Sequence, residues 1–241
     1  MDSEPSLSCA VPRAILFDFY GTLTSACTRG PAHARVPRLL GCDPAEYFAV
    51  LETSFYPRCR GTYGDALETM RWVADELGVR VTPGRLRAAQ AARLTAVRAD
   101  TRLRPEAVPV LWALRRTGVR LAVVSDCAWE LPEIMRALPI DHLIDVKVYS
   151  VHVGQSKPHP RMYLTACERL GVEPAESVFV GDGGSRELTG AQALGMRAIR
   201  LAAPDLAEHL QYASDDAFTG ETAASLAEAA VLATAAQAVA V

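Results

Sequence analysis

Residues 14–24 read AILFDFYGTLT, a short apolar run followed by an acid and a turn. A continuous apolar run of this length is typical of a strand buried on both faces of a sheet, so residues 14–17 are predicted to form a strand. Asp18 follows it directly, and the Gly21-Thr22 turn offers backbone amides that can hold an anion. A carboxylate beside a buried strand is costly unless it is paired or coordinated. The stretch therefore predicts a strand that ends in a functional acid.

Further apolar runs bounded by turn residues predict four more strands. They lie at residues 119–124, 146–151, 178–180 and 196–201. Helical patterns separate them from residue 105 onward, and a final helix is expected within residues 222–241. Alternating strands and helices imply a mainly parallel sheet with helices on both faces. We therefore expect an α/β fold with a three-layer, Rossmann-like core.

A long insertion separates the first two predicted strands. The first strand ends near Asp18 and the second begins at Val119, whereas a crossover between parallel strands needs only about 30 residues. Helical patterns occupy residues 44–56, 64–77 and 83–99 of this gap. We therefore expect residues 25–100 to form a small all-helical domain over the sheet, and residues 1–24 and 101–241 to form the core domain.

Composition narrows the classes of partner. The 241 residues include 25 Lys and Arg against 28 Asp and Glu, a net charge of -3, without a block of basic residues. This balance argues against nucleic acid or an anionic membrane as a partner. No apolar stretch reaches the roughly 18 residues of a membrane span, the first residues lack a signal-peptide pattern, and the cysteines are scattered. We expect a cytoplasmic monomer or homodimer.

Polar side chains follow the later strands as well. Ser125 and Asp126 come after the second strand, Lys157 precedes a proline ahead of a helix, and Asp182 opens a glycine-rich turn that leads to Glu187. Ligands of open parallel sheets bind at the carboxyl ends of the strands, so we expect these groups to meet Asp18 at one edge. Lys157 is one of only two lysines in the chain, which suggests that a compact ammonium is needed there.

These four pieces, in this order and spacing, resemble the haloacid dehalogenase superfamily of hydrolases, whose helical cap is inserted between the first and second motifs. The resemblance implies that Asp18 is the nucleophile, and that Ser125 and Lys157 bind phosphoryl oxygens. It further implies a substrate-binding set and a Mg²⁺ site. The first comprises Gly21, Thr22, Ser125 and Asp126; the second comprises Asp18, Asp182, the backbone carbonyl of Tyr20 and, directly or indirectly, Glu187.

The implied function is a Mg²⁺-dependent phosphatase that acts on a small phosphorylated metabolite through an aspartyl-phosphate. One departure concerns Tyr20, which stands where phosphatases of this family carry a second Asp for acid and base catalysis. A phenol with a pKa near 10 can donate a proton but is a poor base near neutrality. A second departure is Asp126, which stands where the family usually has Asn.

Tyr20 leaves two alternatives open. One is a metal-independent 2-haloacid dehalogenase, a branch with Tyr at this position; against it, Asp182 and Glu187 match the metal-binding form of the fourth motif. The other is a relative that binds phosphorylated ligands without catalysis. A Schiff-base phosphonate hydrolase is disfavoured because residues 25–100 contain no lysine. The substrate is not identified, and candidate residues in the insertion are Tyr47, Phe55, Tyr56, Arg58, Arg60, Tyr63 and Trp72.

Overall fold

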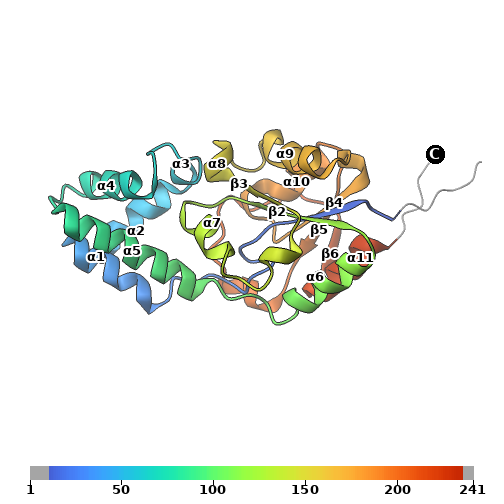
Figure 1. The fold of residues 1–241 in the computed structure, drawn as a ribbon, viewed down its shortest axis with the longest axis horizontal. Helices are drawn as coiled ribbons and strands as arrows, with labels where there is room; N and C mark the ends of the chain where they lie inside the picture. The colour runs from blue at the N-terminus through green and yellow to red at the C-terminus, as the bar shows by residue number, and fades with distance from the viewer. Residues whose placement is uncertain (1–10, 236–241) are drawn as a thin grey trace, which may run out of the picture.

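Parallel strands form a single six-stranded sheet in the computed structural model, which describes residues 11–235 (Figure 1). The strands are β1 (Ala14–Phe17), β2 (Arg120–Ser125), β3 (Val146–Tyr149), β4 (Ser177–Gly181), β5 (Arg197–Leu201) and β6 (Glu221–Ala223). Their order across the sheet is β3-β2-β1-β4-β5-β6, and every neighbouring pair is parallel. The strand predicted from the opening stretch therefore lies inside the sheet, between β2 and β4.

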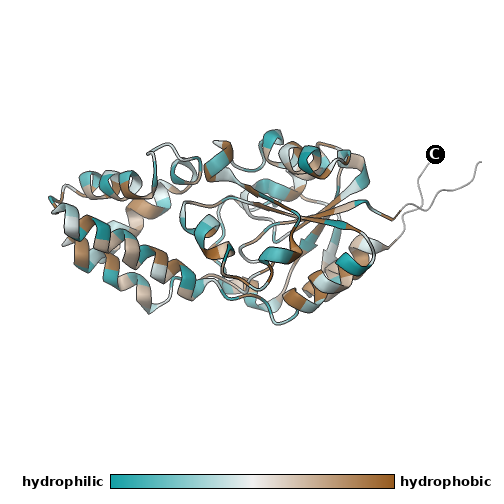
Figure 2. Ribbon diagram, in the orientation of Figure 1, coloured by the Kyte–Doolittle hydropathy of each residue, from teal (hydrophilic) through white to brown (hydrophobic). Residues whose placement is uncertain are grey.

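Helices cover both faces of this sheet. One face packs against α6 (Ala107–Arg116), α7 (Glu130–Met135) and α11 (Leu226–Thr234), and the other against α9 (Pro160–Leu170) and α10 (Glu187–Gln192). Successive side chains of β1 alternate between the two apolar clusters, as the pleat of a strand requires. Figure 2 shows the strands as largely hydrophobic, in contrast to the polar outer sides of the helices. The expected three-layer α/β fold is confirmed.

Two of the differences between the predicted and the observed element ends have a clear cause. The run at residues 146–151 is a strand only to Tyr149, because Ser150–Val153 forms the short helix α8; an apolar run alone does not distinguish a buried strand from a buried helix. The final helix begins at Leu226, since Thr222 belongs to the edge strand β6. Residues 236–241 of that predicted helix lie outside the described residues.

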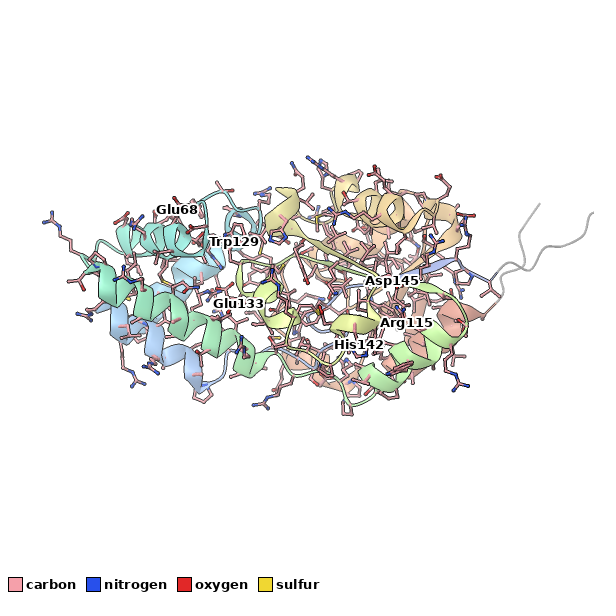
Figure 3. All side chains as sticks on the ribbon, viewed as in Figure 1. Glu68, Arg115, Trp129, Glu133, His142 and Asp145 are labelled. Atoms are coloured by element: carbon pink, nitrogen blue, oxygen red, sulfur yellow. The ribbon has the colours of Figure 1, made fainter. Side chains whose placement is uncertain are left out.

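Residues 25–100 contain five α-helices where the sequence predicted three. They form α1 (Arg35–Leu40), α2 (Pro44–Thr53), α3 (Phe55–Cys59), α4 (Ala66–Glu76) and α5 (Pro83–Asp100). The helix predicted over residues 44–56 is interrupted at Ser54, which separates α2 from α3. Asp65 and Glu68, the latter labelled in Figure 3, form a reciprocal capping box at the start of α4. An apolar cluster that includes Tyr47 and Met70 joins α1, α2, α4 and α5.

Short 3₁₀ turns complete the described elements. They are η1 (Pro31–Ala34), η2 (Asp141–Leu143), η3 (Pro174–Glu176), η4 (Gly184–Arg186) and η5 (Pro204–Glu208). Within residues 11–235, every helix is too short or too polar to span a lipid bilayer.

The chain enters and leaves the helical insertion at one place. Thr24 and Leu103 form an isolated antiparallel bridge, and the amide of Ser25 donates to the carbonyl of Arg102 at 2.9 Å. A second contact lies farther away, where the Trp129 indole donates to the carbonyl of Gly64 at 2.8 Å. Figure 3 places Trp129 between the inserted helices and the sheet. The insertion therefore folds back over the edge of the sheet that carries Asp18.

Candidate active site

A cavity of about 180 Å³ lies between the carboxyl ends of the strands and the inserted helices. Asp18, Lys157, Asp182 and Glu187 line it from the sheet side, while α3 and α5 supply residues from the insertion. This is the edge at which open parallel sheets bind ligands. The structure therefore brings together the carboxylates and the ammonium that the sequence predicted to meet.

Lys157 joins two carboxylates from different strand ends. Its Nζ lies 2.5 Å from Asp18 Oδ1 and 2.5 Å from Glu187 Oε2, and all three side chains are buried. Burial alone would lower the pKa of Lys157, but Asp18, Glu187 and Asp126 outweigh it and raise the pKa well above its ordinary value. The ammonium therefore stays charged and fixes the position of Asp18.

Three carboxylates form a compact acidic cluster. Asp18, Asp182 and Glu187 each offer an oxygen, and these oxygens lie within 4.8 Å of one another. Burial raises the pKa of Asp18 above its ordinary value although Lys157 opposes it, and burial likewise raises the pKa of Glu187. A single ammonium does not neutralise this cluster, and uncompensated buried charge is costly. Hard oxygen donors around excess negative charge fit a divalent cation such as Mg²⁺.

The glycine-rich turn after β4 places Glu187 in this cluster. Glu187 Oε1 accepts from the amide of Gly183 at 3.0 Å, which turns its other oxygen toward Lys157. A Cβ at Gly181 would lie only 2.0 Å from Glu187 Oε1, so any larger residue at position 181 would displace the Glu187 side chain. Ser185 and Arg186 follow with positive φ angles of 55° and 50°, a conformation that costs energy outside glycine.

Asp126 holds the backbone of Lys157 in place. Its Oδ1 accepts from the Lys157 amide at 2.9 Å, while its Oδ2 is buried and has no hydrogen-bond partner among the described residues. Burial raises the pKa of Asp126 to about 6, against the opposing effect of Lys157. The Asp126 side chain lines the cavity, and its hydrogen bond is to the backbone amide of Lys157. Sequence reasoning placed Asp126 in the substrate-binding set and missed this positioning contact.

Three predicted substrate-binding residues do not line the cavity in the described part of the chain: Gly21, Thr22 and Ser125. The amide of Gly21 donates to Thr24 Oγ1 at 3.0 Å, so it is engaged within the turn. The hydroxyls of Thr22 and Ser125 are buried, with no hydrogen-bond partner within residues 11–235. Their predicted role in substrate binding therefore stays a prediction.

Tyr20 lines the cavity beside Asp18. Its ring packs edge-on against Phe19, with ring centroids 5.0 Å apart. Burial raises the pKa of the Tyr20 phenol well above its ordinary value, and nearby thiols and Glu130 add to the effect. The phenol is therefore neutral near pH 7, so it can donate a proton and cannot serve as a base.

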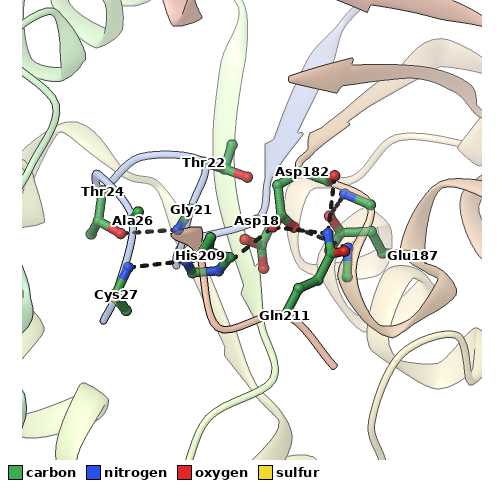
Figure 4. A network of polar contacts seen from close by, with 12 residues as sticks. Asp18, Gly21, Thr22, Thr24, Ala26, Cys27, Asp182, Glu187, His209 and Gln211 are labelled. Atoms are coloured by element: carbon green, nitrogen blue, oxygen red, sulfur yellow. Dashed lines mark hydrogen bonds and ion pairs between the residues drawn. The ribbon is translucent and has the colours of Figure 1, made fainter. Parts of the chain in front are cut away.

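Sequence reasoning missed two residues from the loop after β5. His209 Nε2 lies 3.6 Å from Asp182 Oδ2, and its Nδ1 accepts from the amide of Cys27 at 3.0 Å. Gln211 donates to Asp182 Oδ2 at 3.2 Å (Figure 4). The loop therefore holds Asp182 from the solvent side. No motif marks these residues, because the contact depends on how the loop folds back over the cluster.

Comparison with known proteins gives a consistent result. The model of the haloacid dehalogenase-like hydrolases matches residues 12–195. The (S)-2-haloacid dehalogenase 1 of a Pseudomonas species is 30% identical over 200 residues, which cover 78% of this chain and 84% of that enzyme. The glyceraldehyde 3-phosphate phosphatase of Methanopyrus kandleri is 38% identical over 98 residues. That match covers 40% of this chain and 42% of the phosphatase.

A solved structure supports the fold alone. The phosphatase from Thermococcus onnurineus superposes with a TM-score of 0.62 at 23% identity, over 93% of this chain and 99% of that one.

Proposed function

This chain belongs to the haloacid dehalogenase-like hydrolases, and within that family we propose that it is a Mg²⁺-dependent phosphatase of a small phosphorylated metabolite. The acidic cluster of Asp18, Asp182 and Glu187 carries the proposal. It suits a cation that binds phosphate oxygens, and it would repel the carboxylate of a haloacid in the absence of a cation. We further propose residues 25–100 as the cap that covers the site.

Asp18 is the nucleophile in this proposal. Lys157 holds one of its oxygens, Oδ1, which leaves Oδ2 to attack phosphorus. The bond from phosphorus to the leaving alcohol oxygen breaks as the bond to Oδ2 forms, and the product on the protein is an aspartyl-phosphate. Water then attacks this phosphorus and passes one proton to a phosphoryl oxygen, the bond to Asp18 breaks, and inorganic phosphate leaves. Splitting the hydrolysis in this way replaces one difficult step by two easier ones.

Lys157 has a second task in both steps. Its ammonium stays charged and lies at the centre of the carboxylates, so it stabilises negative charge on the phosphoryl oxygens. Asp18, Asp182 and Glu187, with the carbonyl of Tyr20, would hold Mg²⁺. When bound, this ion neutralises the carboxylates and polarises a phosphoryl oxygen.

Tyr20 sets the kind of leaving group that the site handles well. Its neutral phenol can donate a proton to a departing alkoxide, although an acid with a pKa nearer to neutrality is more effective. We therefore propose fast turnover for leaving groups that need little protonation and slow turnover for simple alkyl phosphates.

Two observations favour a second candidate, a metal-independent 2-haloacid dehalogenase. Halide leaves without a proton, which suits Tyr20, and a dehalogenase relative aligns over 84% of its length. Carboxylate attack at carbon would use the same Asp18. The acidic cluster is the argument against it, because a metal-free site would bring a substrate carboxylate close to three buried acids.

The deciding experiment measures phosphate release from 4-nitrophenyl phosphate, with Mg²⁺ or with EDTA, by the wild type and by Asp18→Asn. Activity that requires both Mg²⁺ and Asp18 is expected, and Asp75→Asn on the exposed face of α4 is the matched control. Halide release from 2-chloropropionate in EDTA, with no phosphate release, would favour the dehalogenase. Tight binding of phosphate esters without turnover of either substrate would indicate the non-catalytic relative.

A further inference from the structure

The wall of the cavity opposite Asp18 carries several basic side chains from the insertion. Three of these side chains each pair with a carboxylate: Arg29 pairs with Glu52 at 2.7 Å, Arg93 with Glu130 at 2.5 Å, and His33 with Asp100 at 2.9 Å. Arg58, on α3, also lines the cavity and is only 4% exposed. No carboxylate lies within ion-pair distance of Arg58 in residues 11–235. Arg58 is therefore a buried charge without its own counterion.

Neutral acceptors use only part of the Arg58 guanidinium. Nε donates to Ser54 Oγ at 3.0 Å, and Nη2 donates to the carbonyl of Leu51 at 2.7 Å. These two contacts fix the orientation of the planar group. A guanidinium has five N–H donors, so three have no acceptor within residues 11–235, and Arg58 lines both this cavity and a smaller one beside α4.

Arg58 and Arg93 together carry more positive charge than their neighbour Glu130 balances. Burial lowers the pKa of Arg58, and the nearby guanidinium of Arg93 lowers it further. Glu130 already contacts Arg93, and both guanidiniums contribute to its lowered pKa. Two arginines therefore face a single carboxylate, and a buried cation left unpaired is costly.

We propose that Arg58 binds a carboxylate on the substrate, at the opposite end from the phosphoryl group. This rests on the proposed function, and it narrows the substrate to phosphorylated carboxylic acids. The excess of one positive charge matches a monoanion, whereas a second phosphate would carry about two negative charges into the same place. The substrate carboxylate would form an ion pair with Arg58. The phosphoryl group would lie at the other end of the cavity, beside the acidic cluster that would hold Mg²⁺.

The test compares phosphorylated ω-hydroxycarboxylic acids of two to six carbons with alkyl phosphates of equal length, in which a methyl group replaces the carboxylate. At the matching length, the wild type is expected to prefer the carboxylate ester at least about thirtyfold in kcat/KM, mainly through KM. Arg58→Met is expected to reduce this preference to within about threefold, and Arg58→Lys to keep part of it. Arg71→Met, an exposed arginine on α4, is the matched control and should keep the preference.

Calorimetric binding of the same esters to Asp18→Asn, with Mg²⁺, separates this inference from the proposed function. Tighter binding of the carboxylate ester, lost on adding Arg58→Met, supports the inference even if the wild type releases no phosphate. Equal affinity for the two esters at every length overturns it, even if the wild type is an active phosphatase. Because the wild-type comparison needs no substitution at Arg58, a variant that fails to fold does not affect the result.

Discussion

Replacing Asp126 by Asn is expected to remove a pH-dependent loss of stability. Burial raises the pKa of Asp126 from 3.8 to about 6, so the folded protein binds this proton more tightly than the unfolded chain does. The neutral carboxyl stabilises the fold fully below pH 3.8, and this contribution is lost as the pH rises through about 6. Linkage gives a loss of about 1.4 kcal/mol in the free energy of unfolding between about pH 5 and pH 8, out of a total of about 3 kcal/mol.

Asn keeps the oxygen that accepts from the Lys157 amide but carries no charge at any of these pH values. Urea unfolding of both proteins in EDTA at several pH values measures the difference in unfolding free energy. This difference should move in favour of Asp126→Asn by about 1.4 kcal/mol from about pH 5 to pH 8. Asp75→Asn, at an exposed position, should show no such trend. A difference that is constant over this range would refute the conclusion that burial raises the pKa of Asp126.

Three other substitutions test the acidic cluster and its neighbour. Gly181→Ala places a Cβ 2.0 Å from Glu187 Oε1, so we expect the Glu187 side chain to move. The affinity for Mg²⁺, measured by calorimetry, should then fall at least about tenfold. An unchanged affinity would contradict the steric argument. Glu187→Gln keeps the shape but removes a charge, and should weaken Mg²⁺ binding by about 10- to 100-fold while near-native thermal unfolding shows that the fold is kept. Tyr20→Asp supplies the stronger acid, and should raise kcat for alkyl phosphates at least about tenfold with little effect on 4-nitrophenyl phosphate; equal effects on both would argue against a shortage of acid catalysis.

Local pattern was sufficient for most of the sheet because its strands are buried. The continuous apolar runs at β1 and β2 have no alternative explanation of comparable strength, and both form as predicted. The edge strand β6 was not predicted because its three residues include the polar Glu221 and Thr222. It pairs with β5 through the backbone and through an ion pair between Glu221 and Arg197 of β5 at 2.6 Å. Helix α1 was likewise missed, since it spans six residues and contains Pro37.

The sequence predicted which chemical groups meet, but not how each one is held. Asp18, Lys157, Asp182 and Glu187 are found together because the ends of parallel strands converge, and that follows from strand order alone. The contact from Asp126 to the lysine loop depends on the path of a loop, and so does the approach of His209 to Asp182. Arg58 has no carboxylate partner within residues 11–235, and this depends on which residues lie near it in the folded protein, which the sequence alone does not show.

The antiparallel bridge between Thr24 and Leu103 has a consequence for the evolution of specificity. Because both connecting peptides leave the sheet side by side, the whole helical insertion behaves topologically as one closed loop. Doubling the length of a loop costs only about 0.6 kcal/mol in closure entropy, so a longer, shorter or different insertion is tolerated with little penalty. Asp18 and Lys157 lie outside that loop. Catalytic chemistry and substrate choice can therefore diverge at separate rates within a single gene.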